Sequence, residues 1–188
     1  MRTTSYLEWE ELKILLSKIQ DKKLRLLFAT QSLLGLRIGD ALNIKWKQMI
    51  VNNQPLSRLV IIESKTKKTR ELLINDSLKS IIVDCYEGQK ESEYAFLNRR
   101  GTKTISRSYV NRSLKKLFRE LNIKYEGNIS THLLRKSFAR RYLELNNYSE
   151  KALLIMKETF GHSSLEITKI YIGLRKDEMM SVYKNLEL

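Results

Sequence analysis

Proline and glycine are scarce in this sequence, and that scarcity limits the folds it can adopt more than any other feature. Its 188 residues include one proline, Pro55, and seven glycines. Both residues interrupt helices and strand interiors and are common in turns, so a chain that uses few of them has short connections. The sequence therefore predicts a helix-rich fold. Its length suits a single domain over residues 1–188 with room for a hydrophobic core.

Apolar side chains recur at helical spacing in several segments, which predicts where the helices lie. Asp21 can cap the first turn of one helix, and Gly35 is placed to end it. Other helices are predicted over residues 8–19, 76–86, 106–121, 131–145 and 150–160, with a last one from about residue 176.

Three short β-prone runs and two turns lie between residues 46 and 74. The runs are Met49–Val51, Leu59–Ile62 and Leu72–Ile74, and the turns are 52–55 and 65–69. They predict a small antiparallel meander. The expected fold class is α+β and mainly α, a helical domain with a small antiparallel three-stranded sheet.

The charge balance favours a polyanionic partner. Lysine and arginine number 35 against 21 acidic residues, which gives a formal net charge of +14. Nucleic acid is the most common partner of so basic a domain, although a lysine-rich solvated surface is the alternative. The predicted helix 106–121 buries one apolar stripe and carries bases on its opposite face, as if to lie along a phosphate backbone. These bases are Arg112, Lys115, Lys116 and Arg119.

Several other classes of protein are disfavoured. No apolar run reaches the roughly 18 residues of a membrane span, and the acidic amphipathic start is not a signal peptide. The single cysteine, Cys85, allows no internal disulfide framework and fits a reducing cytosol. With two histidines and no cluster of carboxylates, no metal site is predicted, which argues against a metal-dependent nuclease. A cytoplasmic protein is expected.

A few residues occupy settings that suggest chemistry. His132 and Arg135 are spaced i, i+3 and share one helix face. His162 follows Gly161, and Tyr171 comes nine residues later. Two further candidates are Arg37, just past the predicted helix end, and Lys65, at the start of a basic turn. Each of them alone is explained more often by packing, helix capping or solvation than by a function.

Together and in this order, these residues resemble the tyrosine recombinase (phage integrase) family over about residues 5–183. GLRIGDALNIKW is similar to the family's first arginine box, with Arg37 and the acidic position Asp40. SKTKKTRELLI resembles the hairpin that carries the family's lysine, at Lys65. HLLRKSFA resembles its His-x-x-Arg box, and FGHSSLEITKIY resembles its last box, with His162 and Tyr171.

The resemblance implies a site-specific DNA recombinase or integrase that cuts and rejoins strands through a covalent 3′-phosphotyrosine. Tyr171 would be the nucleophile, Arg37 and Arg135 would hold the non-bridging phosphate oxygens, His132 would accept the tyrosine proton, and Lys65 would protonate the 5′ oxygen. His162 would hydrogen-bond the phosphate. Asp40 would orient Arg37, and a further role in orienting His132 is also compatible. The phosphotyrosyl bond conserves the energy of the broken strand, so neither cofactor, ATP nor metal is implied.

The implied partners are double-stranded DNA and further copies of the chain, a monomer in solution that forms a tetrameric synapse on DNA. The tail helix, residues 174–188, would dock on a neighbouring protomer, although packing on its own domain is equally compatible.

The sequence departs from the family pattern in three respects. Asp40 stands where Glu is more usual. The hairpin lacks a common proline and offers Lys67 and Lys68 as rivals to Lys65 and as further DNA contacts. The upstream helical domain that closes around DNA is expected to be absent, which fits either an excised domain or the single-domain invertases of fimbrial switches. A catalytically silent DNA-binding module and a type IB topoisomerase-like relaxing enzyme remain the alternatives.

Overall fold

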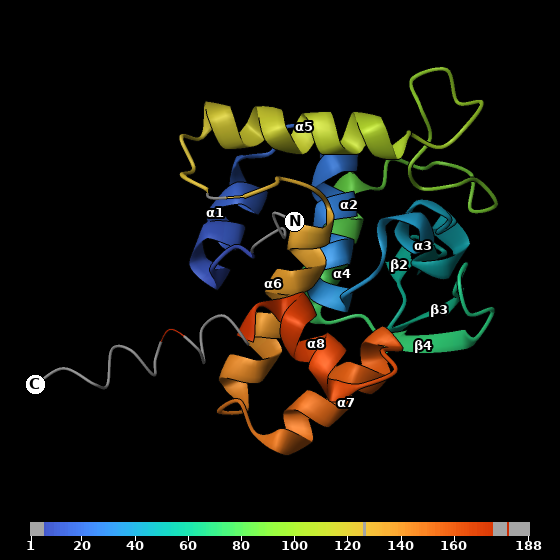
Figure 1. Cartoon of the computed structure of the whole chain (residues 1–188). Coiled ribbons are helices and arrows are strands. Elements are labelled where there is room, and N and C mark those ends of the chain that lie inside the picture. Colours follow the sequence, from blue (N-terminus) through green and yellow to red (C-terminus); the bar gives the residue numbers. More distant parts are fainter. Residues whose placement is uncertain (1–5, 126, 175–179, 181–188) are drawn as a thin grey trace, which may run out of the picture.

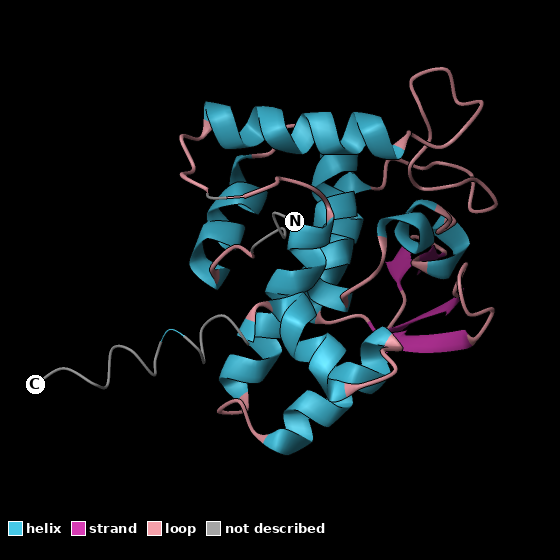
Figure 2. Cartoon of the chain, in the orientation of Figure 1, coloured by secondary structure: helices cyan, strands magenta, loops and turns pink. Residues whose placement is uncertain are grey.

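The computed structural model describes residues 6–125, 127–174 and 180. Helices form most of it, and small antiparallel sheets lie to one side (Figures 1 and 2), so the predicted class is confirmed. The described helices are α1 (Trp9–Lys18), α2 (Lys22–Leu34), α3 (Ile38–Leu42), α4 (Asp76–Cys85), α5 (Arg107–Glu120), α6 (His132–Leu145), α7 (Glu150–Phe160) and α8 (Leu165–Ile172). A 3₁₀ turn, η1, spans Trp46–Gln48.

Local signals set the helix ends, as the sequence predicts. The Asp21 side chain accepts a hydrogen bond from the Leu24 backbone N–H at 3.0 Å, which satisfies a donor in the first turn of α2. Gly35 ends the same helix with φ of 62°, a left-handed conformation that glycine adopts without a steric cost. Because this turn is tight, α3 begins only a few residues later. That short helix was not predicted from the sequence.

Two apolar clusters hold the fold together, and α6 belongs to both. The larger cluster surrounds α2, which is buried on nearly all sides and packs against α4 and α6. The smaller one joins the second half of α6 to α7 and α8 through residues that include Leu143, Met156 and Phe160. Figure 1 shows α7 and α8 at the end of α6 that lies away from α5. The first turns of α6 therefore lie where the two clusters meet.

The predicted three-stranded sheet is wrong in one respect, because the strands form two separate hairpins. Strand β1 (Ile50–Val51) pairs with β2 (Gln54–Pro55), and β3 (Arg58–Ile62) pairs with β4 (Thr69–Leu73), both antiparallel. Asn52 and Asn53 have φ of 51° and 61°, which makes a two-residue turn. The chain thus returns at once along β1, which pairs with β2 and not with β3.

Other expectations concern single features. The helix predicted from about Lys176 lies outside the described residues. Cys85 is buried in α4, and burial raises the pKa of its thiol to about 11, which keeps it protonated and unreactive at neutral pH. None of the described helices is both long and apolar enough to cross a membrane.

Candidate active site

The carbonyl group of Phe160, at the end of α7, is the point where the two predicted arginines meet. Arg37 Nη2 donates a hydrogen bond to this oxygen at 2.8 Å, and Arg135 Nη2 lies 3.5 Å from it. Arg37 is the N-cap residue of α3, whereas Arg135 lies one turn into α6. A backbone oxygen that cannot move independently of α7 therefore sets the spacing of the two guanidinium groups.

Arg135 is almost fully buried. Its Nη1 donates to the carbonyl oxygen of Gly35 at 2.6 Å, and its guanidinium stacks on the Phe160 ring with 3.9 Å to the ring centre. Burial lowers the pKa of Arg135 to about 10, which leaves the group cationic at neutral pH. Arg135 is therefore a fixed positive charge with little freedom to reorient.

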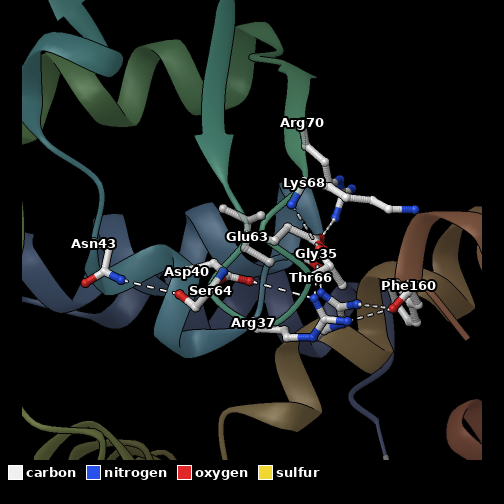
Figure 3. A network of polar contacts seen from close by, with 12 residues as sticks. Gly35, Arg37, Asp40, Asn43, Glu63, Ser64, Thr66, Lys68, Arg70 and Phe160 are labelled. Atoms are coloured by element: carbon white, nitrogen blue, oxygen red, sulfur yellow. Dashed lines mark hydrogen bonds and ion pairs between the residues drawn. The ribbon is translucent and has the colours of Figure 1, made fainter.

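Arg37 lies between two carboxylates, as Figure 3 shows. Its Nη1 is 3.3 Å from Glu63 Oε1 and 3.8 Å from Asp40 Oδ2. Asp40 is buried, and its Oδ1 accepts a hydrogen bond from the Ser64 backbone N–H at 2.8 Å. No hydrogen bond or ion pair joins Asp40 to His132 in the described part of the chain. Asp40 thus connects α3 to the β3–β4 turn.

Tyr171 and the two histidines lie next to one another. Tyr171 Oη is 3.4 Å from His132 Nδ1, within hydrogen-bond range. The rings of His162 and Tyr171 make an edge-to-face contact with 5.3 Å between their centres, and His162 Nδ1 is 3.0 Å from Thr168 Oγ1. Burial raises the pKa of Tyr171, while the positive charges of Arg135 and Arg37 oppose that rise. The pair of arginines thus favours the tyrosinate.

Both histidines are set to be neutral near pH 7. Partial burial lowers the pKa of His132, and the charges of Arg135 and Lys136 lower it further. Burial likewise lowers the pKa of His162, together with the charges of Arg135, Arg37 and Lys65. A neutral imidazole beside a phenol can accept its proton, so the geometry and charge of His132 suit a general base.

The remaining predicted residues lie on the surface. Lys65 is exposed in the β3–β4 turn, near enough for its charge to act on His162. Lys67 and Lys68 are exposed in the same turn. All four predicted bases of α5 are exposed: Arg112, Lys115, Lys116 and Arg119. The described residues contain no group of three or more His, Cys, Asp or Glu that could hold a metal ion.

Three residues near the site were missed by sequence reasoning. Glu63 is buried, and its signal was available: the inward positions of β3 alternate through Leu59 and Ile61, so the next inward side chain belongs to a glutamate. Lys136 is buried too, with its Nζ 5.0 Å from the Tyr171 ring centre, and burial lowers its pKa to about 8. The guanidinium of Arg107, at the start of α5, packs against Gly39, where an added Cβ would force the arginine side chain to shift.

This arrangement of two arginines, two histidines and a tyrosine on a mainly helical domain defines a class of DNA-strand-transfer enzymes, the tyrosine recombinases. The model of the phage integrase family matches residues 5–178, and the chain belongs to that family.

Individual relatives agree with this membership. The chain is 35% identical over 150 residues to "Probable integrase/recombinase YoeC" of Bacillus subtilis strain 168, covering 80% of this chain and 77% of YoeC. It is 27% identical over 150 residues to tyrosine recombinase XerH of Campylobacter jejuni, covering 77% of this chain but 39% of XerH.

Solved structures share the fold. The crystal structure of XerA recombinase matches all of this chain and 67% of its own, with a TM-score of 0.70 and 19% identity. The catalytic domain of bacteriophage HP1 integrase matches over 96% of this chain and 94% of its own, with a TM-score of 0.60 and 21% identity. The chain has the fold of a tyrosine recombinase catalytic domain.

Proposed function

We propose that this chain cleaves and rejoins double-stranded DNA at specific sites through a covalent bond between Tyr171 and a 3′ phosphate. The observation that carries the proposal is the position of Tyr171 Oη, 3.4 Å from Nδ1 of His132, an imidazole held neutral by its surroundings. A phenol is a poor nucleophile near neutral pH unless a base or positive charge assists it. Here both are present, since Arg37 and Arg135 favour the tyrosinate.

In the proposed step, Tyr171 Oη attacks the phosphorus atom of the scissile phosphodiester and its proton passes to His132. Arg37 and Arg135 stabilise the charge on the non-bridging oxygens with guanidinium groups whose spacing is fixed by the Phe160 carbonyl. His162 donates a hydrogen bond to the same phosphate. The bond from phosphorus to the 5′ oxygen breaks, and Lys65 gives this oxygen a proton.

Rejoining is the reverse reaction, with the 5′ hydroxyl of another strand as the nucleophile. Since the phosphotyrosyl bond keeps the energy of the broken strand, the reaction as proposed consumes no ATP. The two arginines and the lysine supply the positive charge that a metal ion would otherwise provide. Covalent adduct should therefore form in excess EDTA.

Recombination is favoured over simple relaxation of DNA by the nature of the relatives. YoeC and XerH carry the names of recombinases, and XerH and lambda integrase have been solved on DNA substrates. By analogy, copies of this chain would assemble as a tetramer around two duplexes and remain monomeric without DNA. The tail, residues 174–188, is proposed to contact a neighbouring protomer. Exchange of strands between two duplexes distinguishes this activity from that of a topoisomerase.

A nicked suicide duplex tests the central claim, because loss of the short 5′ fragment traps the covalent intermediate. The natural site is not needed if a pool of duplexes is screened for adduct first. Tyr171→Phe should abolish the adduct, which is detected on a denaturing gel and located by peptide mapping. Folding and DNA affinity should stay nearly unchanged because only one oxygen is removed.

Tyr142 provides a matched control, since it is also half-buried and packs against the same small apolar cluster as Tyr171. Tyr142→Phe should form adduct at the wild-type rate. An adduct that persists in Tyr171→Phe, or nucleotide mass on another tyrosine, would overturn the proposal.

A further inference from the structure

Glu63 is a buried carboxylate with no role in the proposed chemistry. Its side chain occupies the inward register position that follows Leu59 and Ile61, where an apolar residue would fit the pattern, and it is 5% exposed. Burying a charged carboxylate is costly unless it is well paired. Such a residue at the base of the turn that carries Lys65 therefore calls for an explanation beyond packing.

Three contacts converge on this one side chain. Arg70 Nη1 donates to Oε1 at 2.8 Å, Arg37 Nη1 lies 3.3 Å from the same oxygen, and Thr66 Oγ1 donates to Oε2 at 2.7 Å. Burial alone would raise the pKa of the Glu63 carboxyl. The hydrogen bonds from Arg70 and Thr66 and the charges of both arginines outweigh it, so the pKa lies below its ordinary value. Glu63 is therefore an anion at neutral pH.

The backbone of Glu63 also closes the turn. Its N–H donates to the Lys68 carbonyl oxygen and its carbonyl accepts from the Lys67 N–H, each at 2.9 Å. Next to it, the Ser64 N–H donates to Asp40 Oδ1. The turn that presents Lys65 is thus attached to α3, the helix capped by Arg37, through two buried carboxylates, which Figure 3 shows side by side.

From these contacts we infer that Glu63 is a positioning residue, which fixes the Lys65 turn relative to Arg37. The inference rests on the proposed function, in which Arg37 holds the phosphate and Lys65 protonates the 5′ oxygen of the same phosphodiester. These two tasks need the Arg37 and Lys65 cations at a set distance from one another. Arg37 precedes α3, however, and Lys65 lies in the β3–β4 turn. Glu63 and Asp40 join the elements, and of these two carboxylates it is Glu63 that contacts both Arg37 and a side chain of the turn.

The negative charge of Glu63 matters as well as its hydrogen bonds. Arg37, Arg70 and Arg135 are close enough for their charges to act on one another, and all would repel Lys65. One anion among them allows the turn to stay near the arginines. In Glu63→Gln the hydrogen-bonding shape is largely kept while the charge is lost, so the turn should move away from Arg37.

The test uses two suicide duplexes that differ in one atom. One has the ordinary 5′ oxygen at the scissile position, and the other has sulfur in its place. A thiolate leaves without being protonated, so cleavage of the sulfur duplex does not need Lys65. A defect in placing Lys65 should therefore appear on the oxygen duplex and be relieved on the sulfur duplex, whereas a general defect of folding should appear on both.

Glu63→Gln should slow adduct formation on the oxygen duplex by about 10- to 100-fold, the cost of misplacing a catalytic group by about 1 Å. Most of that loss should be restored by sulfur. Thr66→Val removes the hydroxyl that donates to Oε2 and accepts from the Lys68 N–H. The position is exposed, so the variant should fold and show a smaller loss that sulfur also restores. Glu63→Gln combined with Lys65→Ala should be as slow on the oxygen duplex as Lys65→Ala alone.

Glu71 is the matched control. It lies in the same hairpin and forms an ion pair with Arg58 at 2.7 Å, but it is exposed. The carboxylates that contact Arg37 are Glu63 and Asp40. Glu71→Gln should cleave both duplexes at the wild-type rate.

The inference is wrong if Glu63→Gln is as fast as Glu71→Gln, if its loss is equal on the two duplexes, or if the losses of the double variant multiply. Absence of adduct from the wild-type chain on either duplex would instead overturn the proposed function, and the inference with it.

Discussion

Helices α5 and α6 are both 14 residues long and both carry many cations, yet they use them in opposite ways. On α5 the predicted bases all point to solvent, and the buried side chains are Val110, Leu114 and Phe118. On α6 the cations are themselves part of the interior: Arg135, Lys136 and Arg140 are all buried. Figure 1 shows α5 across the top of the molecule and α6 beginning below it, and Asn111 Oδ1 on α5 accepts a hydrogen bond from the N–H of Thr131, the N-cap residue of α6.

Under the proposed function, the difference corresponds to two ways in which a protein can use positive charge on DNA. A hydrated cation on α5 can contact any phosphate within reach, so its effect depends on how many such cations there are and is weakened by salt. A buried cation on α6 is held by specific acceptors, as Arg135 is by Gly35 and Phe160, so its effect depends on position. We therefore expect α5 to govern affinity and α6 to govern the rate of cleavage.

The largest effect should come from removing the fixed charge of α6. Arg135→Ala should abolish detectable adduct on the suicide duplex, because loss of one preorganised donor typically costs about 10²–10³ in rate. His162→Ala should leave measurable adduct, since a neutral imidazole offers one hydrogen bond where arginine offers a charge and a fork. Arg119→Ala on α5 should cleave at the wild-type rate when DNA is saturating. Equal losses for Arg135→Ala and His162→Ala, with both proteins folded, would show that their roles are misassigned.

The sequence predicts α5 more completely than α6, for a physical reason. The boundaries of both helices follow from local patterns, and the Ser106 side chain caps α5 as expected from its predicted start. The burial of Arg135 depends on acceptors 100 and 25 residues away in the chain, which no periodicity reveals. Resemblance to a family locates the boxes without giving the contacts between them. For that reason the link from Glu63 to Arg37 was missed, although the register of β3 indicates an inward side chain.

A smaller effect, on affinity alone, is expected from the exposed bases of α5. Binding by the wild-type chain should weaken with salt, with a slope of log K against log salt near −5 if about six phosphates are neutralised. Each α5 base that contacts a phosphate should contribute about 0.9 to that slope, so changing Arg112, Lys115, Lys116 and Arg119 to Gln should make it clearly shallower. Cleavage at saturating DNA should not change.

Equilibrium titrations from low to moderate salt measure the slope, with Lys13→Gln and Lys18→Gln on α1 as the control. An unaltered slope in the α5 variant would contradict the division of roles between the two helices.

The smallest effect concerns the stability of the free protein and the buried lysine of α6. Burial lowers the pKa of Lys136 to about 8 from an ordinary value of 10.5. Between these two pH values the unfolded chain binds more protons at this residue than the folded chain does, so the free energy of unfolding should gain a contribution that rises with pH. Below about pH 8 both states are protonated and the contribution is flat.

Urea denaturation at several pH values from 7 to 10.5 should therefore show a steeper rise for the wild type than for Lys136→Met. Lys115→Met on α5 should keep the wild-type profile, because that ammonium is hydrated in both states. If Lys136→Met and the wild type give parallel profiles, the lysine of α6 is as well hydrated as those of α5, and the contrast between the helices would then hold for Arg135 but not for Lys136.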